Sequence, residues 1–269
     1  MNSFTVKGVC FGSGRPKTIV SLMDACEEAL VACAERAVAA GVDCLEWRAD
    51  FASDLGKAAV AHTGRTLMEV LPATPLVFTF RSAGQGGARA IEPDVYTKLV
   101  RTVIEAQAAD IVDVELGIGT DAVRELVTLA HVHGMRAIVS HHDFAGTPSV
   151  AAMEELIAQM AELGADLPKL AVMAHDVIDC LHLMEATARM RERLGKPLVT
   201  MAMGGTGTLS RLAGEATGSA LTFCALDAPS APGQVGLAQA TAAMERLHAA
   251  MAPAADASEV ISRNGKERA

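Results

Sequence analysis

Two short stretches of the chain place reactive side chains inside runs that are typical of buried strands. Residues 137–144 are Ala-Ile-Val-Ser-His-His-Asp-Phe, and residues 168–174 are Pro-Lys-Leu-Ala-Val-Met-Ala. Apolar, β-branched runs of this length indicate strands covered on both faces. Lys169 and His142 are unexpected there, because burial disfavours a charged side chain. A neutral lysine amine attacks ketones and aldehydes, and a histidine carries protons, so the pair predicts a Schiff-base enzyme.

Each of the two residues also has a structural interpretation when it is taken alone. Lys169 would then begin its strand with its amine in solvent at the bottom of the fold, and His142 would be a hydrogen-bonded core histidine. Their positions on neighbouring predicted strands favour the functional interpretation, because neighbouring strands can present both side chains to one site.

The composition limits the classes of function. A net charge of −9 argues against a nucleic-acid surface. No apolar run approaches 18 residues and residues 1–7 lack a signal-peptide core, so we expect a cytoplasmic protein without a membrane partner. The six cysteines include no Cys-x-x-Cys pair, which favours free thiols. His131 and His133 are two residues apart and do not share a helix face, so we expect no metal site.

Eight strand–helix units follow one another without a domain linker. The strands are expected at residues 18–23, 44–50, 76–80, 111–116, 137–144, 168–174, 197–203 and 221–225. This number of units, about 25–35 residues apart, predicts a single-domain (β/α)8 TIM barrel over residues 1–252. A doubly wound sheet of eight strands is the second interpretation. We expect residues 1–17 to lack regular structure and the polar segment 253–269 to be disordered.

Several helix ends are predicted from local signals. Glycines at 41, 134, 164 and 195 follow helical segments and are expected to end them. Helix starts are expected where a short polar side chain can accept a hydrogen bond from the first turn. The predicted N-caps are Asp24, Asp121, Thr147 and Asp176.

A barrel would bring the carboxyl ends of its strands to one mouth. The chain supplies polar side chains there, on strands or in the following loops: Ser21, Glu46, Arg48, Arg81, Glu115, His142, Lys169, Arg211, Ser230 and Gln234. Arg211 opens a predicted helix, where a cation opposes the helix dipole, so it is better explained by an anion that it faces, most naturally a carboxylate. The turn Gly204-Gly-Thr-Gly207 could instead cradle a phosphate, but it matches no Walker or dinucleotide motif.

The chain resembles the type I 3-dehydroquinate dehydratase family from about residue 17 to residue 250. The motifs that carry the resemblance occur in the same order: Glu46-Trp-Arg-Ala-Asp50, Phe78-Thr-Phe-Arg-Ser-Ala83 with Gly86-Gly87, Asp113-Val-Glu115, Ser140-His-His-Asp-Phe144, Pro168-Lys-Leu-Ala-Val-Met173, Ser210-Arg-Leu-Ala-Gly-Glu215 and Ser230-Ala-Pro-Gly-Gln234. The family implies a (β/α)8 barrel, commonly a homodimer, that needs no metal or organic cofactor. Its activity is a hydro-lyase step of the shikimate pathway, which leads to aromatic amino acids: 3-dehydroquinate becomes 3-dehydroshikimate and water.

The resemblance also implies roles for individual residues. Lys169 matches the Schiff-base lysine, His142 the proton-transfer histidine, and Arg211 the arginine that binds the substrate carboxylate. The other positions that match substrate-binding residues are Ser21, Glu46, Trp47, Arg48, Arg81, Ser230 and Gln234.

The chain departs from the family pattern beside the histidine. Many members carry Glu where this chain has Gln85, and many have Asn where it has His141. A neutral amide can hydrogen-bond to an imidazole but cannot stabilise its cation, so Gln85 predicts a slower enzyme or a lower pKa of His142.

Two other functions stay open at this level. One is another Schiff-base barrel enzyme of the aldolase type acting on a phosphorylated sugar, for which the Gly204–Gly207 turn is the best support. The other is a catalytically weakened paralogue that binds a related metabolite as a sensor, for which Gln85 is the only support.

Overall fold

In the computed structural model, which describes residues 2–251, eight consecutive parallel strands form the wall of a barrel. The strands are β3 (Lys17–Leu22), β4 (Cys44–Arg48), β5 (Leu76–Thr79), β6 (Ile111–Glu115), β7 (Arg136–Asp143), β8 (Leu167–Met173), β9 (Val199–Met203) and β10 (Leu221–Ala225). The last strand, β10, pairs in parallel with the first, β3, and the others pair in chain order. This order confirms the predicted (β/α)8 barrel and excludes the doubly wound sheet, in which the strand order would reverse.

The seam between β9 and β10 is the least regular part of the wall. The two strands do not form a continuous ladder, and one isolated bridge between Leu198 and Ser219 joins their starts. Ala220 N donates to Leu198 O at 2.8 Å beside that bridge. At this seam, the barrel is therefore closed mainly at the amino-terminal ends of β9 and β10.

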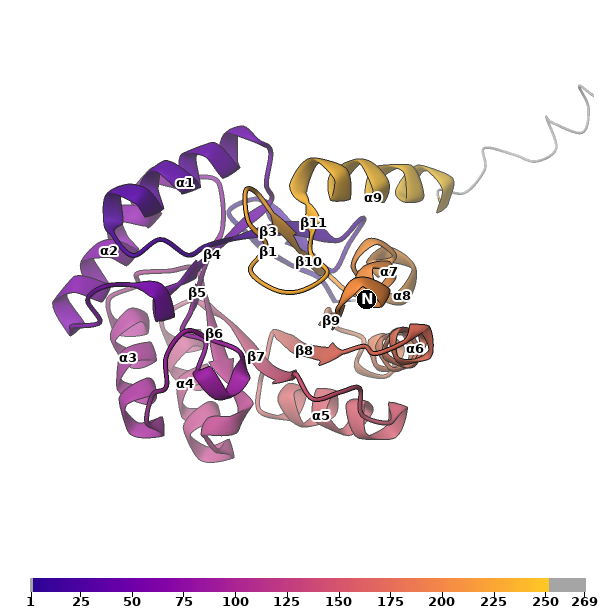
Figure 1. The fold of residues 1–269 in the computed structure, drawn as a ribbon. Coiled ribbons are helices and arrows are strands. Elements are labelled where there is room, and N and C mark those ends of the chain that lie inside the picture. The colour runs from indigo at the N-terminus through magenta and orange to yellow at the C-terminus, as the bar shows by residue number, and fades with distance from the viewer. Residues whose placement is uncertain (1, 252–269) are drawn as a thin grey trace, which may run out of the picture.

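Helices lie outside the ring of strands (Figure 1). They are α1 (Glu27–Ala39), α2 (Lys57–Val70), α3 (Pro93–Glu105), α4 (Thr120–Val132), α5 (Val150–Glu162), α6 (Val177–Leu194), α7 (Thr208–Leu212), α8 (Gly214–Thr217) and α9 (Leu237–Met251). The larger apolar core lies between these helices and the outward side chains of the strands, such as Leu45, Phe78 and Val139. Within residues 2–251, no helix has the length and apolar character needed to cross a bilayer.

The amino-terminal segment differs from its prediction. Residues 1–17 were expected to lack regular structure, but β1 (Phe4–Val6) and β2 (Val9–Phe11) form an antiparallel hairpin. Phe11 is fully buried and belongs to the second apolar cluster, inside the barrel. The hairpin forms because it covers the open end of the barrel, a tertiary contact that local sequence signals do not report.

The predicted helix ends are partly correct. Asp176 does cap α6, where it accepts a hydrogen bond from Asp179 N at 3.0 Å. The other three predicted caps are wrong, because α1 is preceded by Cys26, α4 by Gly119 and α5 by Ser149. Gly195 ends α6 in the left-handed conformation, as expected. The predicted disorder of residues 253–269 lies outside the described residues.

The barrel interior changes character along its axis. The first inward side chains of the strands are apolar and form the second core cluster with Phe11: Ile19, Cys44, Val77, Ile111, Ile138, Leu167, Val199 and Leu221. The next inward position is polar on most strands: Ser21, Glu46, Thr79, Asp113, Ser140 and Lys169. The apolar end closes the barrel, and the polar level forms the floor of a site at the carboxyl ends of the strands.

Candidate active site

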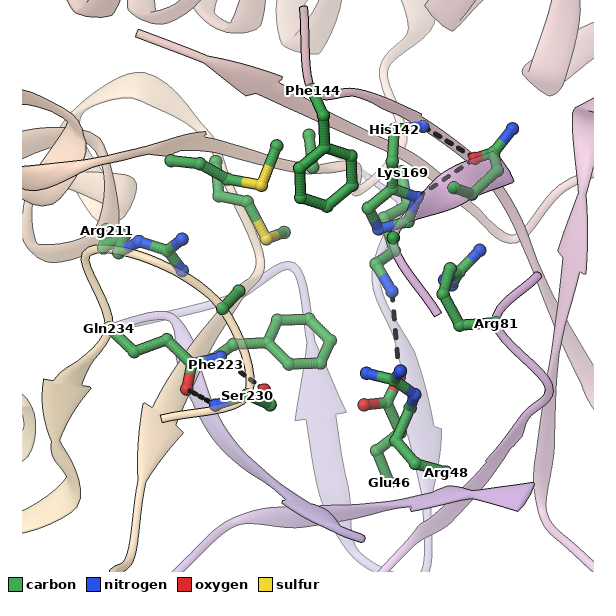
Figure 2. A pocket seen from close by; sticks show the side chains of 16 residues that line it. Glu46, Arg48, Arg81, His142, Phe144, Lys169, Arg211, Phe223, Ser230 and Gln234 are labelled. Carbon is green, nitrogen blue, oxygen red and sulfur yellow. Dashed lines mark hydrogen bonds and ion pairs between the residues drawn. The ribbon is translucent and has the colours of Figure 1, made fainter. Parts of the chain in front are cut away.

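One pocket of about 480 Å³ opens at the carboxyl ends of the strands (Figure 2). Its lining joins residues from β4 to β10 with residues of the following loops: Glu46, Arg48, Arg81, Gln85, Gly86, His142, Phe144, Lys169, Ala171, Met201, Met203, Arg211, Phe223, Ser230, Ala231 and Gln234. Most of the residues proposed from the sequence are in this set. A small polar ligand would fit the pocket.

Lys169 lies at the floor of the pocket with 2% of its surface exposed. Its Nζ donates to Asp113 Oδ2 at 2.9 Å and lies 3.8 Å from Glu46 Oε1. The same nitrogen lies 4.6 Å from the ring centroid of Phe223. The amine is therefore held at one place by charged and aromatic partners, and it is not solvated at the bottom of the barrel.

Asp113 is fully buried and connects the lysine to the neighbouring strands. Its Oδ1 accepts from Ser140 Oγ at 2.6 Å, and its Oδ2 forms an ion pair with Arg81 Nη2 at 2.9 Å. Burial alone would raise the pKa of Asp113, but Arg81, Lys169 and the Ser140 hydroxyl lower it to about 2. The carboxylate is therefore ionised at neutral pH.

Arg81 forms ion pairs with two carboxylates, although its Nη2 makes no hydrogen bond. In addition to Asp113, its Nη1 donates to Glu115 Oε1 and to Ser140 Oγ, each at 2.9 Å. Burial alone would lower the pKa of Arg81, but the two carboxylates outweigh it and raise the pKa. Asp113 and Glu115 were not proposed as a pair of site residues. Because they are two residues apart on one strand, both side chains lie on the inward face of β6.

His142 faces the pocket from β7, next to Lys169 on β8 (Figure 2). Gln85 Oε1 accepts from the His142 backbone N at 2.8 Å and lies 3.3 Å from its Nδ1. Burial, then the charges of Arg81 and Lys169, hold the pKa of His142 well below its usual value. The imidazole is therefore neutral at neutral pH, as a base must be. Burial and cations cause this shift, and the predicted effect of Gln85 stays a prediction.

Glu46 anchors a chain of hydroxyl and amide groups. Its two oxygens accept from Ser21 Oγ at 2.6 Å and from Thr79 Oγ1 at 2.8 Å. Ser21 Oγ lies 3.3 Å from Ser230 Oγ, which accepts from Gln234 Nε2 at 2.7 Å. The loop after β10 is thus tied to the floor of the pocket.

Arg48 lines the pocket but is already paired by the fold. It donates to both oxygens of Asp50, from Nε at 2.8 Å and from Nη2 at 2.7 Å. Asp50 also accepts from the backbone nitrogens of Arg81 and Ala88. The bidentate pair holds Arg48 in one orientation and fixes the loop that carries Gln85.

Arg211 is the exception among the buried charges described here. It is 2% exposed, and its Nη2 donates to Pro232 O at 3.2 Å. Its Nε and Nη1 are buried without a hydrogen-bond partner. Burial lowers the pKa of Arg211 to about 10. A buried guanidinium with free donors and no carboxylate partner suits an anionic ligand such as a carboxylate.

Two residues proposed from the resemblance lie off the pocket wall. Trp47 points outward from β4 into the helix-covered core and packs edge-to-face on Phe78, so the structure does not bring it to the pocket. Ser21 borders the pocket through its hydrogen bond to Glu46. Phe144, Phe223, Met201 and Met203 do line the pocket, although sequence reasoning proposed none of them as binding residues, because apolar side chains on a strand carry no signal of function.

The glycine turn at 204–207 has a packing explanation. A Cβ on Gly207 would lie 2.4 Å from Ala202 O, and a Cβ on Gly233 would lie 2.2 Å from Gly204 O. Two backbones therefore meet there at a distance that only glycine allows. These contacts explain Gly207 and Gly233 without a phosphate, whereas Gly205 has open space around it.

No metal cluster supplements the site within the described part of the chain. Residues 2–251 contain no group of three or more His, Cys, Asp or Glu side chains placed to hold an ion. The polar atoms that converge on the pocket are instead an amine, an imidazole, carboxylates and guanidinium groups, and most of them are paired with each other.

The fold and the site define a (β/α)8-barrel enzyme with a buried lysine at the centre of its catalytic face. The model of the type I 3-dehydroquinase family matches residues 18–251, and the chain belongs to this family. Membership makes it a carbon–oxygen lyase of the hydro-lyase class.

Individual relatives agree over nearly their whole length. The 3-dehydroquinate dehydratase of Listeria welshimeri is 41% identical over 249 residues, which are 92% of this chain and 99% of the relative. That of Escherichia coli O9:H4 is 41% identical over 254 residues, 93% and 100% of the two chains. The crystal structure of the type I enzyme from Clostridium difficile, solved with covalently modified comenic acid, superposes with a TM-score of 0.89 at 37% identity and covers 93% of this chain and 99% of its own.

Proposed function

We propose that this chain converts 3-dehydroquinate to 3-dehydroshikimate and water through a Schiff base on Lys169. The observation that carries the proposal is that Lys169, His142 and the two unpartnered nitrogens of Arg211 belong to one pocket. A ketone-reactive amine, a proton carrier and a carboxylate receptor are the three groups that this reaction requires. The names of the relatives support the same substrate.

The chemistry begins at the ring ketone. The neutral amine of Lys169 attacks carbon 3 to give a carbinolamine. Its hydroxyl takes up a proton, relayed from solvent by His142, and leaves as water, which gives an iminium. The iminium withdraws electrons and so acidifies the proton on carbon 2, which neutral His142 removes. His142 then returns a proton to the hydroxyl on carbon 1, which leaves as water, and hydrolysis of the iminium releases the product.

The remaining pocket residues orient the ring. Arg211 holds the carboxylate on carbon 1 with the donors that the fold leaves free. Ser230, Gln234, Glu46, Arg48 and Arg81 are placed to bind ring hydroxyls or to fix the groups that do. The loop from Ser230 to Gln234 closes one side of the pocket over this anchor and reduces access of water to the iminium.

The proposed setting is the shikimate pathway in the cytoplasm, with the chain as a homodimer. These statements rest on membership of the family, because contacts within a single chain do not report its location or its oligomeric state. Sedimentation equilibrium of the purified protein tests the dimer, because a concentration-independent monomer mass would contradict it.

The test of the reaction uses two measurements on the purified full chain. Product formation appears as ultraviolet absorbance of the conjugated enone after addition of 3-dehydroquinate. Borohydride added during turnover reduces the iminium to a stable amine, and peptide mass spectrometry locates it. Turnover with modification of Lys169 is the expected result. Modification without turnover would favour the weakened metabolite-binding paralogue, and neither turnover nor modification would contradict the proposal.

A further inference from the structure

We infer that Asp113 and Phe223 form a cation site for the Lys169 nitrogen, stabilising the positive charge that this nitrogen gains when the iminium forms. This inference deepens the proposed function and rests on its Schiff base. It assigns positioning roles to two residues: a carboxylate that reaches Lys169 from β6 and an aromatic ring that reaches it from β10.

The two partners approach Lys169 from different sides of the barrel. Lys169 is on β8, and the strand order places β6 two strands away in one direction and β10 two strands away in the other. The carboxylate contact is 2.9 Å long, and the ring centroid lies 4.6 Å from the same nitrogen. A cation within about 6 Å of a ring centroid is attracted by the ring quadrupole.

The other charged groups around the nitrogen have different primary partners. Glu46 lies farther from it, at 3.8 Å, and its oxygens accept from Ser21 and Thr79. Arg81 is paired with Asp113 and Glu115, and His142 contacts Gln85. Asp113 and Phe223 are therefore the groups best placed to respond to the charge on the lysine.

The charge balance of the covalent step explains why the nitrogen needs such a site. The neutral amine, the ketone and one proton taken up from solvent form an iminium with one N–H and one molecule of water. The C–N bond forms as the C=O bond is lost, one nitrogen-bound proton and the added proton leave in the water, and the charge on nitrogen rises from 0 to +1. An anion and a ring face at this nitrogen therefore stabilise the covalent intermediate more than the free amine.

Asp113 suits this role because it remains an anion. Ser140 and Arg81 contact its oxygens independently of the lysine, and its pKa of about 2 keeps it ionised at the pH of catalysis. Phe223 complements it, since a ring stabilises a cation without accepting its proton. The iminium thus keeps the N–H that makes it an electron sink.

The ring contribution is tested by replacing Phe223 with 4-fluoro-, 3,5-difluoro- and 3,4,5-trifluorophenylalanine in the full chain. Fluorination withdraws charge from the ring face while it nearly preserves volume. We expect kcat, and the fraction of Lys169 trapped by borohydride at equilibrium with 3-dehydroquinate and its product, to fall stepwise, by about 2- to 30-fold in total. The matched control is the same series at Phe4, at the opposite end of the barrel, which should leave both quantities unchanged.

The carboxylate contribution is tested with Asp113→Asn, which keeps an acceptor for Ser140 but removes the charge. The equilibrium trapped fraction should fall by about 10-fold or more, because the iminium loses its counter-ion.

The outcomes separate this inference from the proposed function. If the unmodified protein forms no adduct on Lys169, the Schiff base and the cation site both fail. If it forms the adduct, but the fluorinated series is flat at Phe223, or folded Asp113→Asn keeps the original trapped fraction, the cation site alone is overturned. The fluorinated series decides the question if Asp113→Asn does not fold.

Discussion

The two walls of the pocket differ in whether their cationic side chains have carboxylate partners. On β4 to β8, the charged side chains Arg48, Arg81 and Lys169 all have carboxylate partners within 3 Å. On β9, β10 and the loops after them, the lining is mostly Met201, Met203 and Phe223, and the one cation, Arg211, keeps two buried donors without partners. Folding gives each cation of the first wall a carboxylate partner, although Arg81 Nη2 makes no hydrogen bond, whereas Arg211 on the second wall has no carboxylate partner.

Under the proposed function, the paired charges serve the reaction and the charge without a carboxylate partner serves recognition. A paired cation has a defined position and a defined protonation state before substrate arrives, which preorganises the site. A buried cation with free donors is costly to the fold, and an anion that fills them recovers part of that cost as binding free energy. Substitutions on the two walls should therefore differ in their effects on activity and on stability.

The largest effect is expected for Lys169→Met on the paired wall. Removal of the nucleophile eliminates the covalent route, so kcat should fall by at least about 1,000-fold. Steady-state kinetics and borohydride trapping measure it, with circular dichroism to verify the fold. Activity within 10-fold of the original would show that the lysine is structural.

The sharpest contrast between the walls comes from the two arginines. Arg211→Met should reduce kcat/KM by about 100-fold or more through loss of the carboxylate contact, without lowering the melting temperature. Arg81→Met leaves Asp113 and Glu115 buried without their partner, and it should lower the free energy of unfolding by about 3–5 kcal/mol. Chemical denaturation of both variants measures the difference, and equal losses of stability would remove the distinction between the walls.

The paired wall should also be sensitive to acid. Asp113 has a pKa of about 2 in the folded protein, below its usual value of about 3.8, so its ionised form stabilises the fold. That contribution is complete above about pH 4 and is lost as pH falls toward 2; a shift of this size corresponds to about 2–3 kcal/mol. Urea denaturation between pH 5 and 2.5 should show a steeper loss for the original chain than for Asp113→Asn. Parallel curves would contradict the assignment.

The smallest expected effect concerns the partner of His142. In Gln85→Glu, a carboxylate would replace the amide oxygen 3.3 Å from Nδ1 and would raise the pKa of His142. The acidic limb of the rate profile should move to higher pH, and kcat above that limb should rise by about 3- to 10-fold. Gln85→Asn, which shortens the side chain without adding charge, is the control. A profile unchanged by the glutamate would show that charge at this position does not tune the histidine.

Part of the fold could be predicted from local sequence patterns, because strands and helix ends depend on residues that are close together in the chain. Alternating and β-branched runs determine strands, and the Asp176 cap and the Gly195 stop depend on a few neighbouring residues. Eight such units at a regular period predict the barrel, and the motifs from Glu46 to Gln234 indicate the family. The position of most substrate-binding residues at strand ends follows from the parallel direction of the strands.

Other features depend on residues that are distant in the chain. The hairpin of residues 4–11 forms because the barrel offers it an apolar end to cover, and Trp47 faces outward because its strand alternates about Glu46. Whether a charge is paired also depends on tertiary contacts. The sequence assigned Arg211 to an anion, but it did not show that Arg81 and Lys169 share the carboxylate of Asp113, which reaches both from β6, while Arg211 keeps donors without partners. Side-chain types and their spacing determine the chemistry that is available, and the fold decides which charges are neutralised within the protein and which one is left for a ligand.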